Sequence, residues 1–392
     1  MSWTGTEYRD EAAEAAALRE VVGAVIARSS PPARIRELDA RREFDQGLYE
    51  ALGDAGLIGL DADLDARSTP SAVNETIVLE ELGAGPTSMA VCLVVQYMGL
   101  GLLTRFGDSR QRESVLAPLI DGKQRIAFAL SEPDGGTDVA RAMTTSATQN
   151  GAGKWTINGT KTWISGPRVA GHLILLARTA PLEEPAIDGI TMFLVPVDTP
   201  GVTITELDTL AIHGLDTCEV SFADVELADG AVLGEVGAGF RQVLHTLNSE
   251  RLNAAAVALG IARGALCAAV GYADQRQAFG RSIGSFQASQ HRLVDNVIQF
   301  ESARLLLRQA ADAADNGRRS DILGAMAKVA ASDAATCATD VGMRLMAGAG
   351  FSTDFDMERL FRDARLYTFA PLTDDMLRNH IGEKLLGLPR SY

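Results

Sequence analysis

Helical periodicity dominates the first third of the chain. Apolar residues recur at three- and four-residue steps over 44–60 and 74–85, and both runs end near glycine. This spacing places the apolar side chains on one face of a helix, and a glycine at its end is a common stop signal. The pattern predicts an N-terminal helical domain over 1–124.

The pattern changes to short β-rich runs after about residue 125. The clearest are 154–165, 172–179, 190–197 and 201–207, which are separated by turns rich in Gly, Pro and Asn. Strands bounded by such residues are typical of a compact β structure. We therefore predict a middle, β-barrel-like domain over 125–236.

Alanine- and leucine-rich sequence returns after 233–240. The segments 251–277 and 289–315 predict helices long enough to pack side by side as a bundle. We predict a C-terminal four-helix bundle over 237–392, and the fold class is therefore α+β.

Composition narrows the classes of function. A net charge of −15 argues against nucleic acid as a partner, because no basic patch offsets the repulsion of phosphates. The four cysteines lack the spacing of a metal or redox site, so no metal site is expected. The first residues lack a signal-peptide core, and no run reaches about 18 uninterrupted apolar residues. We expect a cytoplasmic protein without membrane insertion.

Candidate chemistry begins at 129–140, where an apolar run enters a turn containing Gly136 and Thr137. Bare backbone beside a hydroxyl can approach a phosphate-bearing cofactor, although adjacent glycines also occur in ordinary turns. In 159–167, period-two alternation along a strand would place Trp163 and Ser165 on one face. A flat ring and a hydroxyl would then lie side by side.

Four segments, taken in order, resemble acyl-CoA dehydrogenases. They are LSEPDGGTD (130–138), KTWIS (161–165), RQAFGRSIGSFQASQ (276–290) and GAGFSTDFDMERLFRDARLYT (348–368). The resemblance covers almost the whole chain, and several ordered motifs are more specific than any single one. It implies an α, β, α order of domains, with FAD held between the β domain and the C-terminal bundle.

The resemblance also implies which residues contact the flavin end of FAD. Residues matching Phe128, Leu130 and Ser131 run along the flavin edge in the family, and Trp163 with Ser165 matches the pair near flavin N5. Gly136 and Thr137 would approach the pyrophosphate. The alternatives are a solvated turn hydroxyl and a core tryptophan beside a strand serine.

A second group matches positions that reach FAD bound to a neighbouring subunit. Arg276, Phe279 and Gln287 correspond to its adenosine end, although a helix-end arginine is also commonly solvated. Gly348 belongs to a second turn, where this chain has Arg344 in place of the usual Gln and Ala347 in place of Gly. Such a shared site implies a homo-oligomer, at least a dimer and commonly a tetramer.

The resemblance places the catalytic base at one of two positions. The commoner position, shortly after the R-D-A segment, is Pro371 here, and proline cannot accept a proton. The other, typical of isovaleryl-CoA and long-chain acyl-CoA dehydrogenases, is Glu250. Removal of a proton alpha to a thioester needs a carboxylate of raised pKa. The alternative for Glu250 is a solvated helix acid paired with an arginine.

Pro371 also lacks the backbone N–H that helps to polarise the thioester carbonyl in the family. The N–H of Leu372 could donate instead. Thr373 lies where the family often has a threonine contacting FAD. Asp374 and Asp375 are either alternative bases or an acidic cluster at a helix N-terminus, and we favour the cluster.

The leading hypothesis is FAD-dependent α,β-dehydrogenation of an acyl-CoA thioester, with electrons passed to an electron-transferring flavoprotein. An acyl-carrier-protein thioester dehydrogenase and a flavin oxidase or monooxygenase are alternatives on the same fold. A catalytically silent flavoprotein or assembly subunit is an alternative of another class. The acyl chain length and branching stay open.

Overall fold

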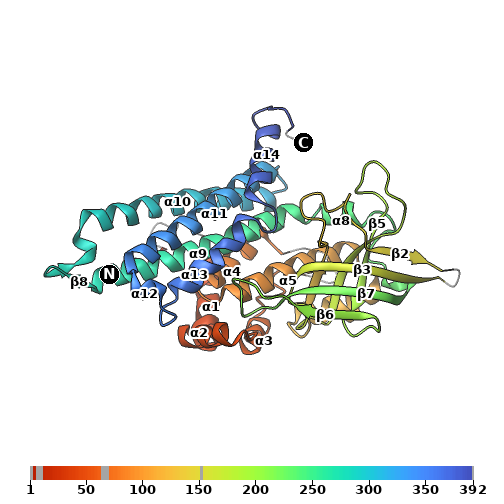
Figure 1. Cartoon of the computed structure of the whole chain (residues 1–392), viewed down its shortest axis with the longest axis horizontal. Coiled ribbons are helices and arrows are strands. Elements are labelled where there is room, and N and C mark those ends of the chain that lie inside the picture. The colour runs from red at the N-terminus through yellow and green to blue at the C-terminus, as the bar shows by residue number, and fades with distance from the viewer. Residues whose placement is uncertain (1–2, 6–11, 63–69, 151–152, 391–392) are drawn as a thin grey trace.

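The computed structural model describes residues 3–5, 12–62, 70–150 and 153–390 (Figure 1). Its N-terminal part is helical, as predicted. Two of its helices, α3 and α4, begin at N-cap residues: the Asp45 and Ser71 side chains accept hydrogen bonds from the backbone N–H groups three residues further along the chain. The elements are α1 (Ala13–Ser29), α2 (Pro32–Arg41), α3 (Gln46–Asp54), α4 (Ala72–Gly83), α5 (Thr87–Phe106), α6 (Ser109–Gln111), η1 (Arg112–Leu116) and α7 (Ala117–Ile120).

A seven-stranded sheet follows, in the order β1-β4-β2-β3-β7-β6 with β5 beside β4. β1 and β2 pair with β4 in parallel, and the other pairs are antiparallel. The strands are β1 (Ile126–Ala129), β2 (Ser146–Gln149), β3 (Lys154–Ser165), β4 (His172–Arg178), β5 (Ile190–Pro196), β6 (Val202–Glu206) and β7 (Thr217–Ala228).

The two faces of the sheet belong to different cores. On β4, Ile174 and Leu176 join the helices, whereas Leu173 and Leu175 pack against residues of β3, β5 and β7. Successive side chains of a strand point to opposite faces, so a fully buried strand reads as one apolar run. The second core lies inside the bent sheet, which gives the domain its barrel-like character.

The C-terminal part is helical, and the predicted α+β class with its three parts is confirmed. In Figure 1 its long helices run side by side away from the sheet, with β8 at the far end. The elements after β7 are η2 (Asp229–Ala231), α8 (Gly239–Val243), α9 (Leu247–Gln275), β8 (Gln277–Ala278), β9 (Arg281–Ser282), η3 (Ile283–Ser285), α10 (Gln287–Asp315), α11 (Asp321–Met346), α12 (Gly348–Phe351), α13 (Met357–Ala364), η4 (Arg365–Thr368) and α14 (Asp374–Lys384).

Glycines let α4 and α9 cross backbone to backbone. A Cβ atom on Gly83 would lie 2.6 Å from the Val257 carbonyl oxygen, and one on Gly264 would lie 2.5 Å from the Ala84 carbonyl oxygen. Real Cβ atoms do not approach backbone so closely, because interiors are close-packed. The N-terminal helices and the C-terminal bundle therefore share one core.

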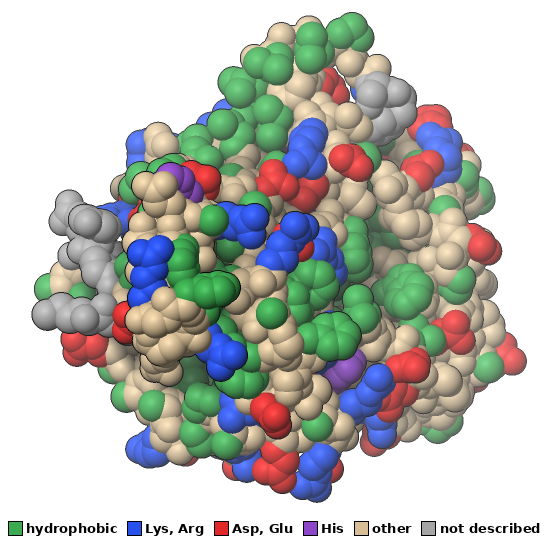
Figure 2. Space-filling view, turned by 60° about the vertical axis from the view of Figure 1, so that its left-hand side comes forward, with side chains coloured by type: hydrophobic (Ala, Val, Ile, Leu, Met, Phe, Trp, Pro, Cys, Tyr) green, Lys and Arg blue, Asp and Glu red, His purple; other side chains and the backbone are tan. Residues whose placement is uncertain are grey.

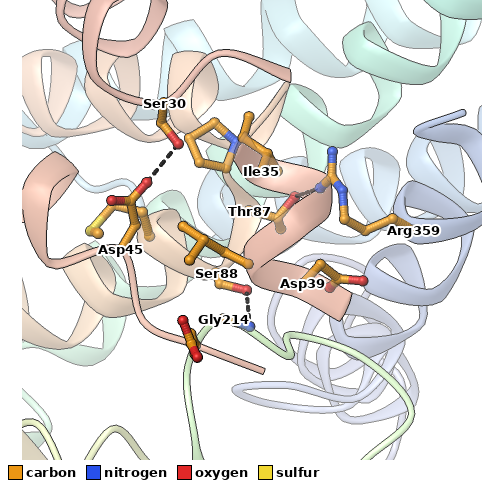
Figure 3. Close-up of a pocket in the computed structure, with 12 residues that line it drawn as sticks. Ser30, Ile35, Asp39, Asp45, Thr87, Ser88, Gly214 and Arg359 are labelled. Atoms are coloured by element: carbon orange, nitrogen blue, oxygen red, sulfur yellow. Dashed lines mark hydrogen bonds between the residues drawn. The ribbon is translucent and has the colours of Figure 1, made fainter. Parts of the chain in front are cut away.

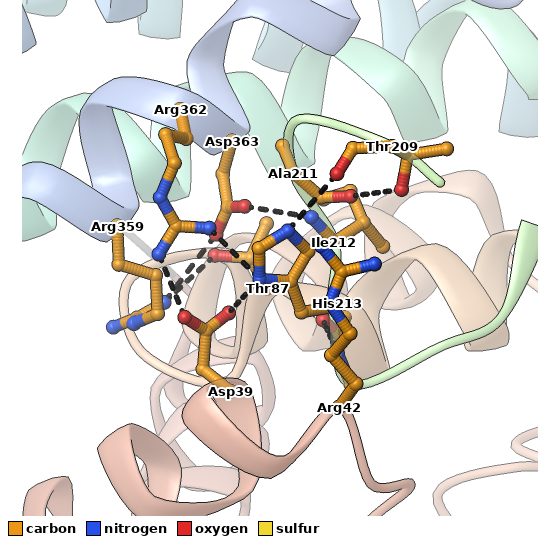
Figure 4. A network of polar contacts seen from close by, with 12 residues as sticks. Asp39, Arg42, Thr87, Thr209, Ala211, Ile212, His213, Arg359, Arg362 and Asp363 are labelled. Atoms are coloured by element: carbon orange, nitrogen blue, oxygen red, sulfur yellow. Dashed lines mark hydrogen bonds and ion pairs between the residues drawn. The ribbon is translucent and has the colours of Figure 1, made fainter. Parts of the chain in front are cut away.

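A polar network joins all three parts (Figure 4). Arg362 on α13 donates to Asp39 of α2 at 2.7 Å and to His213 Nδ1, in the loop before β7, at 3.3 Å. The Ile212 N–H donates to the buried Asp363 carboxylate at 3.1 Å. The segment leading to residues 369–373 is thus fixed against both other domains.

Two helices, α5 and the stretch Asn248–Gln275 of α9, are long and apolar enough to cross a membrane by length and composition alone. However, 72% and 67% of their most apolar windows are buried inside the protein. Burial of this extent is what core helices show.

Candidate active site

The first group of predicted site residues gathers where β1 ends beside β3. Phe128, Leu130 and Ser131 are half-buried, and the Thr162 N–H donates to the Ser131 carbonyl at 2.9 Å. Trp163 follows directly and is 64% exposed. The structure therefore brings the predicted flavin-edge segment and the predicted tryptophan together.

The period of two along β3 is interrupted just before Trp163, and Trp163 and Ser165 both lie at this site. The β3–β7 register shifts between Lys161 and Ile164, and Trp163 has a φ of 61°. The interruption leaves two consecutive buried residues, Lys161 and Thr162. Beyond it Trp163 is exposed, Ile164 is buried and Ser165 is half-buried, so burial alternates again over these three residues.

A fully buried ion pair supports this segment. The Lys161 ammonium donates to Glu132 Oε1 at 2.8 Å and to the Leu130 carbonyl at 2.9 Å. Glu132 also accepts from the N–H groups of Thr144 and Thr145. Burial opposes the charge of Glu132, but Lys161 and these donors lower its pKa to about 2. Sequence reasoning missed this pair, although both residues lie within the quoted motifs.

Three hydroxyl groups in this part of the chain lack a hydrogen-bond partner among the described residues. No described residue hydrogen-bonds to the hydroxyls of Ser131, Thr137 or Ser165, and Gly136 and Thr137 are exposed. Hydroxyls free to bind a ligand, together with an exposed indole, suit a large planar cofactor that carries phosphates. The residues present therefore fit FAD.

The second group lies at the opposite end of the molecule. Arg276 ends α9, Phe279 in the β8–β9 turn is 96% exposed, and Gln287 begins α10 (Figure 1). Arg276 is 26 residues from Glu250 along one helix, which is about 39 Å at 1.5 Å per residue. In Figure 1, β8 beside Arg276 and β3 with Trp163 lie at opposite ends of the molecule, so one chain does not bring the two groups together.

The remaining predicted cofactor residues flank this far end or the other end of the bundle. Arg344 is exposed and pairs with Asp340 at 2.8 Å. Ala347 has a φ of 50°, a conformation that favours glycine, directly before the exposed Gly348. Thr373 caps α14, where its hydroxyl accepts from the Met376 N–H at 3.2 Å.

Glu250 lies in the first turn of α9, half-buried above the core residues Leu252 and Ala254. Burial raises its pKa to about 7, and the adjacent Arg251 opposes this rise. Neither side chain forms an ion pair within 4 Å with a described residue, and Arg251 Nε has no hydrogen-bond acceptor. A carboxyl group poised near neutral pH can accept a proton from a bound substrate.

The loop that contains Pro371 lies between η4 and α14. Asp374 is buried in a pair with Lys328 at 2.7 Å, whereas Asp375 is exposed in the first turn of α14. This arrangement agrees with the acidic cluster at a helix N-terminus, and Lys328 commits Asp374 to a structural contact. No described residue accepts a hydrogen bond from the Leu372 N–H.

Two small cavities lie near the domain junctions. The first is lined by Ser30, Asp45, Thr87 and Arg359 among others, and none of the predicted site residues lines it (Figure 3). The second lies between α5 and β3 and includes Ser165. Of these two cavities, the second touches the candidate site.

Comparison with known proteins covers nearly the whole chain. Residues 12–123, 127–225 and 237–386 match the family models for the N-terminal, middle and C-terminal domains of acyl-CoA dehydrogenases. The chain is 35% identical over 359 residues to the mitochondrial short-chain specific acyl-CoA dehydrogenase of Rattus norvegicus, covering 91% of this chain and 85% of that protein.

Two bacterial proteins are similarly related. The probable acyl-CoA dehydrogenase YngJ of Bacillus subtilis is 33% identical, over 89% of this chain and 92% of its own length. The structure of butyryl-CoA dehydrogenase from Megasphaera elsdenii superimposes with a TM-score of 0.90 and 30% identity, covering 96% of this chain and 99% of that one.

Proposed function

The chain belongs to the acyl-CoA dehydrogenase family, and from this premise we propose that it introduces an α,β double bond into an acyl-CoA thioester with Glu250 as the base. The family makes it an oxidoreductase acting on CH–CH groups of acyl-CoA, and the members of the family are FAD flavoproteins. The proposal adds the residues that carry the reaction in this chain.

Each residue has a distinct task. Glu250 removes the α-proton of the thioester as a carboxylate and keeps that proton. When bound, FAD would supply the acceptor for the hydride of the β-carbon, and loss of this hydride together with the α-proton accounts for the double bond. Ser131, Trp163 and Ser165 would hold the flavin ring, and Gly136 with Thr137 would hold the pyrophosphate. The Leu372 N–H polarises the thioester carbonyl in place of the N–H that Pro371 lacks.

The observation that carries this proposal is the place of Glu250, half-buried in the first turn of α9 and without an ion-pair partner among the described residues. Glu250 is the one acid of this part of α9, and burial shifts its pKa toward neutral pH. The test is anaerobic titration of the FAD-loaded protein with a panel of acyl-CoA thioesters while the visible flavin absorbance is followed. The panel begins with short chains, because the named relatives include short-chain and butyryl enzymes.

The outcomes of this titration separate the candidate functions. Bleaching by a thioester supports dehydrogenation, and transfer of the electrons to an electron-transferring flavoprotein would identify that acceptor. Rapid reoxidation by air would indicate an oxidase or monooxygenase. Reduction only by carrier-protein thioesters would identify these, and not acyl-CoA, as the substrate class. A bound flavin that no thioester bleaches would refute the proposal and favour a silent flavoprotein.

We also propose that the cofactor site is completed by a second copy of the chain, in a homo-oligomer of the tetramer type. Arg276, Phe279 and Gln287 lie too far from Trp163 to contact the same FAD within one chain. Figure 2 turns their end of the molecule forward and shows apolar side chains exposed among charged ones. Exposed aliphatic residues on α10 extend this surface: Val294, Ile298 and Leu305.

Mixing two defective variants tests the shared site. Arg276→Ala and Ser165→Ala chains, each poor in FAD, should regain FAD when unfolded together and reassembled, because one site of each mixed pair is intact. Random pairing restores about a quarter of the sites of a dimer. No recovery in the mixture, with each variant still oligomeric, would show that each site is built from one chain.

A further inference from the structure

A buried lysine holds both ends of the loop that contains Pro371. Lys328 on α11 is 1% exposed, and its ammonium donates to the Tyr367 carbonyl at 2.6 Å, to the Leu372 carbonyl at 3.0 Å and to Asp374 Oδ1 at 2.7 Å. Three acceptors match the three protons of an ammonium group. The charge is therefore fully satisfied by this loop and the start of α14.

Ser332, one helical turn along α11, completes the cluster. Its Oγ lies 2.9 Å from the Tyr367 carbonyl oxygen and 2.8 Å from Asp374 Oδ2. Both carboxylate oxygens of Asp374 are thus engaged. Burial lowers the pKa of Lys328 and Asp374 counteracts that effect, so each charge keeps the other in place.

The loop between these anchors has little support of its own. Phe369 is 55% exposed and Pro371 is exposed. The N–H groups of Phe369 and Ala370 both donate back to the Leu366 carbonyl, so they tie this part of the loop to η4 and not to another element. A loop with few buried contacts samples several conformations unless its ends are fixed.

We propose that Lys328, held by Asp374 and Ser332, is a positioning residue that orients the Leu372 N–H toward the substrate carbonyl. This inference rests on the proposed function. Pro371 offers no N–H, so the next donor along the chain is that of Leu372, and the carbonyl of the same residue is fixed by Lys328. A donor displaced by about 1 Å can cost on the order of a hundredfold in rate.

The decisive variant removes both charges together. Lys328→Met alone would leave a buried unpaired carboxylate and destabilise the protein, whereas Lys328→Met with Asp374→Leu removes the pair and keeps an apolar fill. The matched control is Arg378→Met, because Arg378 pairs with Asp333 across the same two helices at 3.2 Å, but at the surface. Ser332→Ala is a milder second variant, should the double variant not fold.

Two measurements decide the proposal. In the double variant, thioester-driven flavin reduction in a single turnover should fall about 10- to 100-fold, while FAD content and reduction by dithionite stay as in Arg378→Met. Amide hydrogen exchange should also quicken at 368–370. Ser332→Ala should show both effects more weakly. A reduction rate within about threefold of the control, or unchanged exchange, would overturn the positioning role.

The exchange measurement separates this inference from the proposed function. If no thioester reduces the wild-type flavin, the proposed function fails. Amide hydrogen exchange of the loop is then the one measurement that tests whether Lys328, Ser332 and Asp374 hold the loop. Faster exchange in the double variant would then support the clamp on the loop and remove its role in catalysis. Unchanged exchange would refute both.

Discussion

Replacement of Glu250 by glutamine tests the base and its environment with one change. Glutamine keeps the size of the side chain and one carbonyl oxygen but cannot take a proton at neutral pH. General-base catalysis is typically worth 10²- to 10⁴-fold. We therefore expect thioester-driven flavin reduction in Glu250→Gln to slow by about 10²- to 10⁴-fold, with FAD still bound.

The same substitution should slow the reaction but raise the stability of the folded protein at neutral and higher pH. Burial raises the pKa of Glu250 from an ordinary 4.5 to about 7. Below pH 4.5 both folded and unfolded chains carry the proton, so the shift has no effect. Between pH 4.5 and 7 the unfolded chain ionises first, and stability falls as the pH rises. Above pH 7 the free energy of unfolding is lower than at pH 4 by at most about 3 kcal/mol, and by roughly half of that because Glu250 is partly exposed.

Two assays check these expectations. Stopped-flow reduction of the flavin measures the first, and urea unfolding at pH 4 and pH 8 measures the second. Relative to wild type, Glu250→Gln should gain about 1–2 kcal/mol at pH 8 compared with pH 4. Glu113→Gln, an exposed acid outside the site, is the control. Unchanged flavin reduction would refute Glu250 as the base, and an equal stability change at both pH values would refute its buried environment.

Three further changes test other parts of the structure. Lys161→Met leaves a buried carboxylate unpaired, so it should lower the free energy of unfolding in urea by about 3–5 kcal/mol and reduce the FAD content. The control Lys154→Met removes an exposed pair on the same strand and should cost under about 0.5 kcal/mol. Equal effects of the two substitutions would contradict the importance of burial. Ala347→Gly relieves a positive φ and should raise stability by about 1 kcal/mol, so an unchanged melting temperature would show no strain there. Pro371→Ala adds an N–H, but the Leu372 N–H already serves the carbonyl, so the rate of thioester-driven reduction should change by less than about threefold. A tenfold gain would instead mean that the wild-type loop offers the carbonyl no donor.

The fold could be predicted because its elements carry simple periodicity. The run 154–165 coincides with β3, and 251–277 and 289–315 lie almost entirely within α9 and α10. These segments are long and either strongly apolar or alternating, so local pattern and tertiary packing agree. The fold class and the order of the parts followed from this agreement.

The details of the site could not be predicted in the same way. The period of two breaks just before Trp163, where a bulge and a positive φ depend on pairing with β7, which lies more than 50 residues away. The partners of Lys161 and Lys328 are carbonyl and carboxyl groups that only the fold brings together. Nothing in the local sequence distinguishes these lysines from solvated ones.

The glycine crossing of α4 and α9 has a consequence for how the chain unfolds. Because Gly83 and Gly264 place the two backbones in contact, the boundaries near 124 and 236 separate stretches of sequence but not independent folding units. Proteolytic nicking of a connecting loop would leave the fragments associated, and a separately expressed N-terminal fragment would expose the apolar side of α4. The whole helical framework should therefore melt in one cooperative transition.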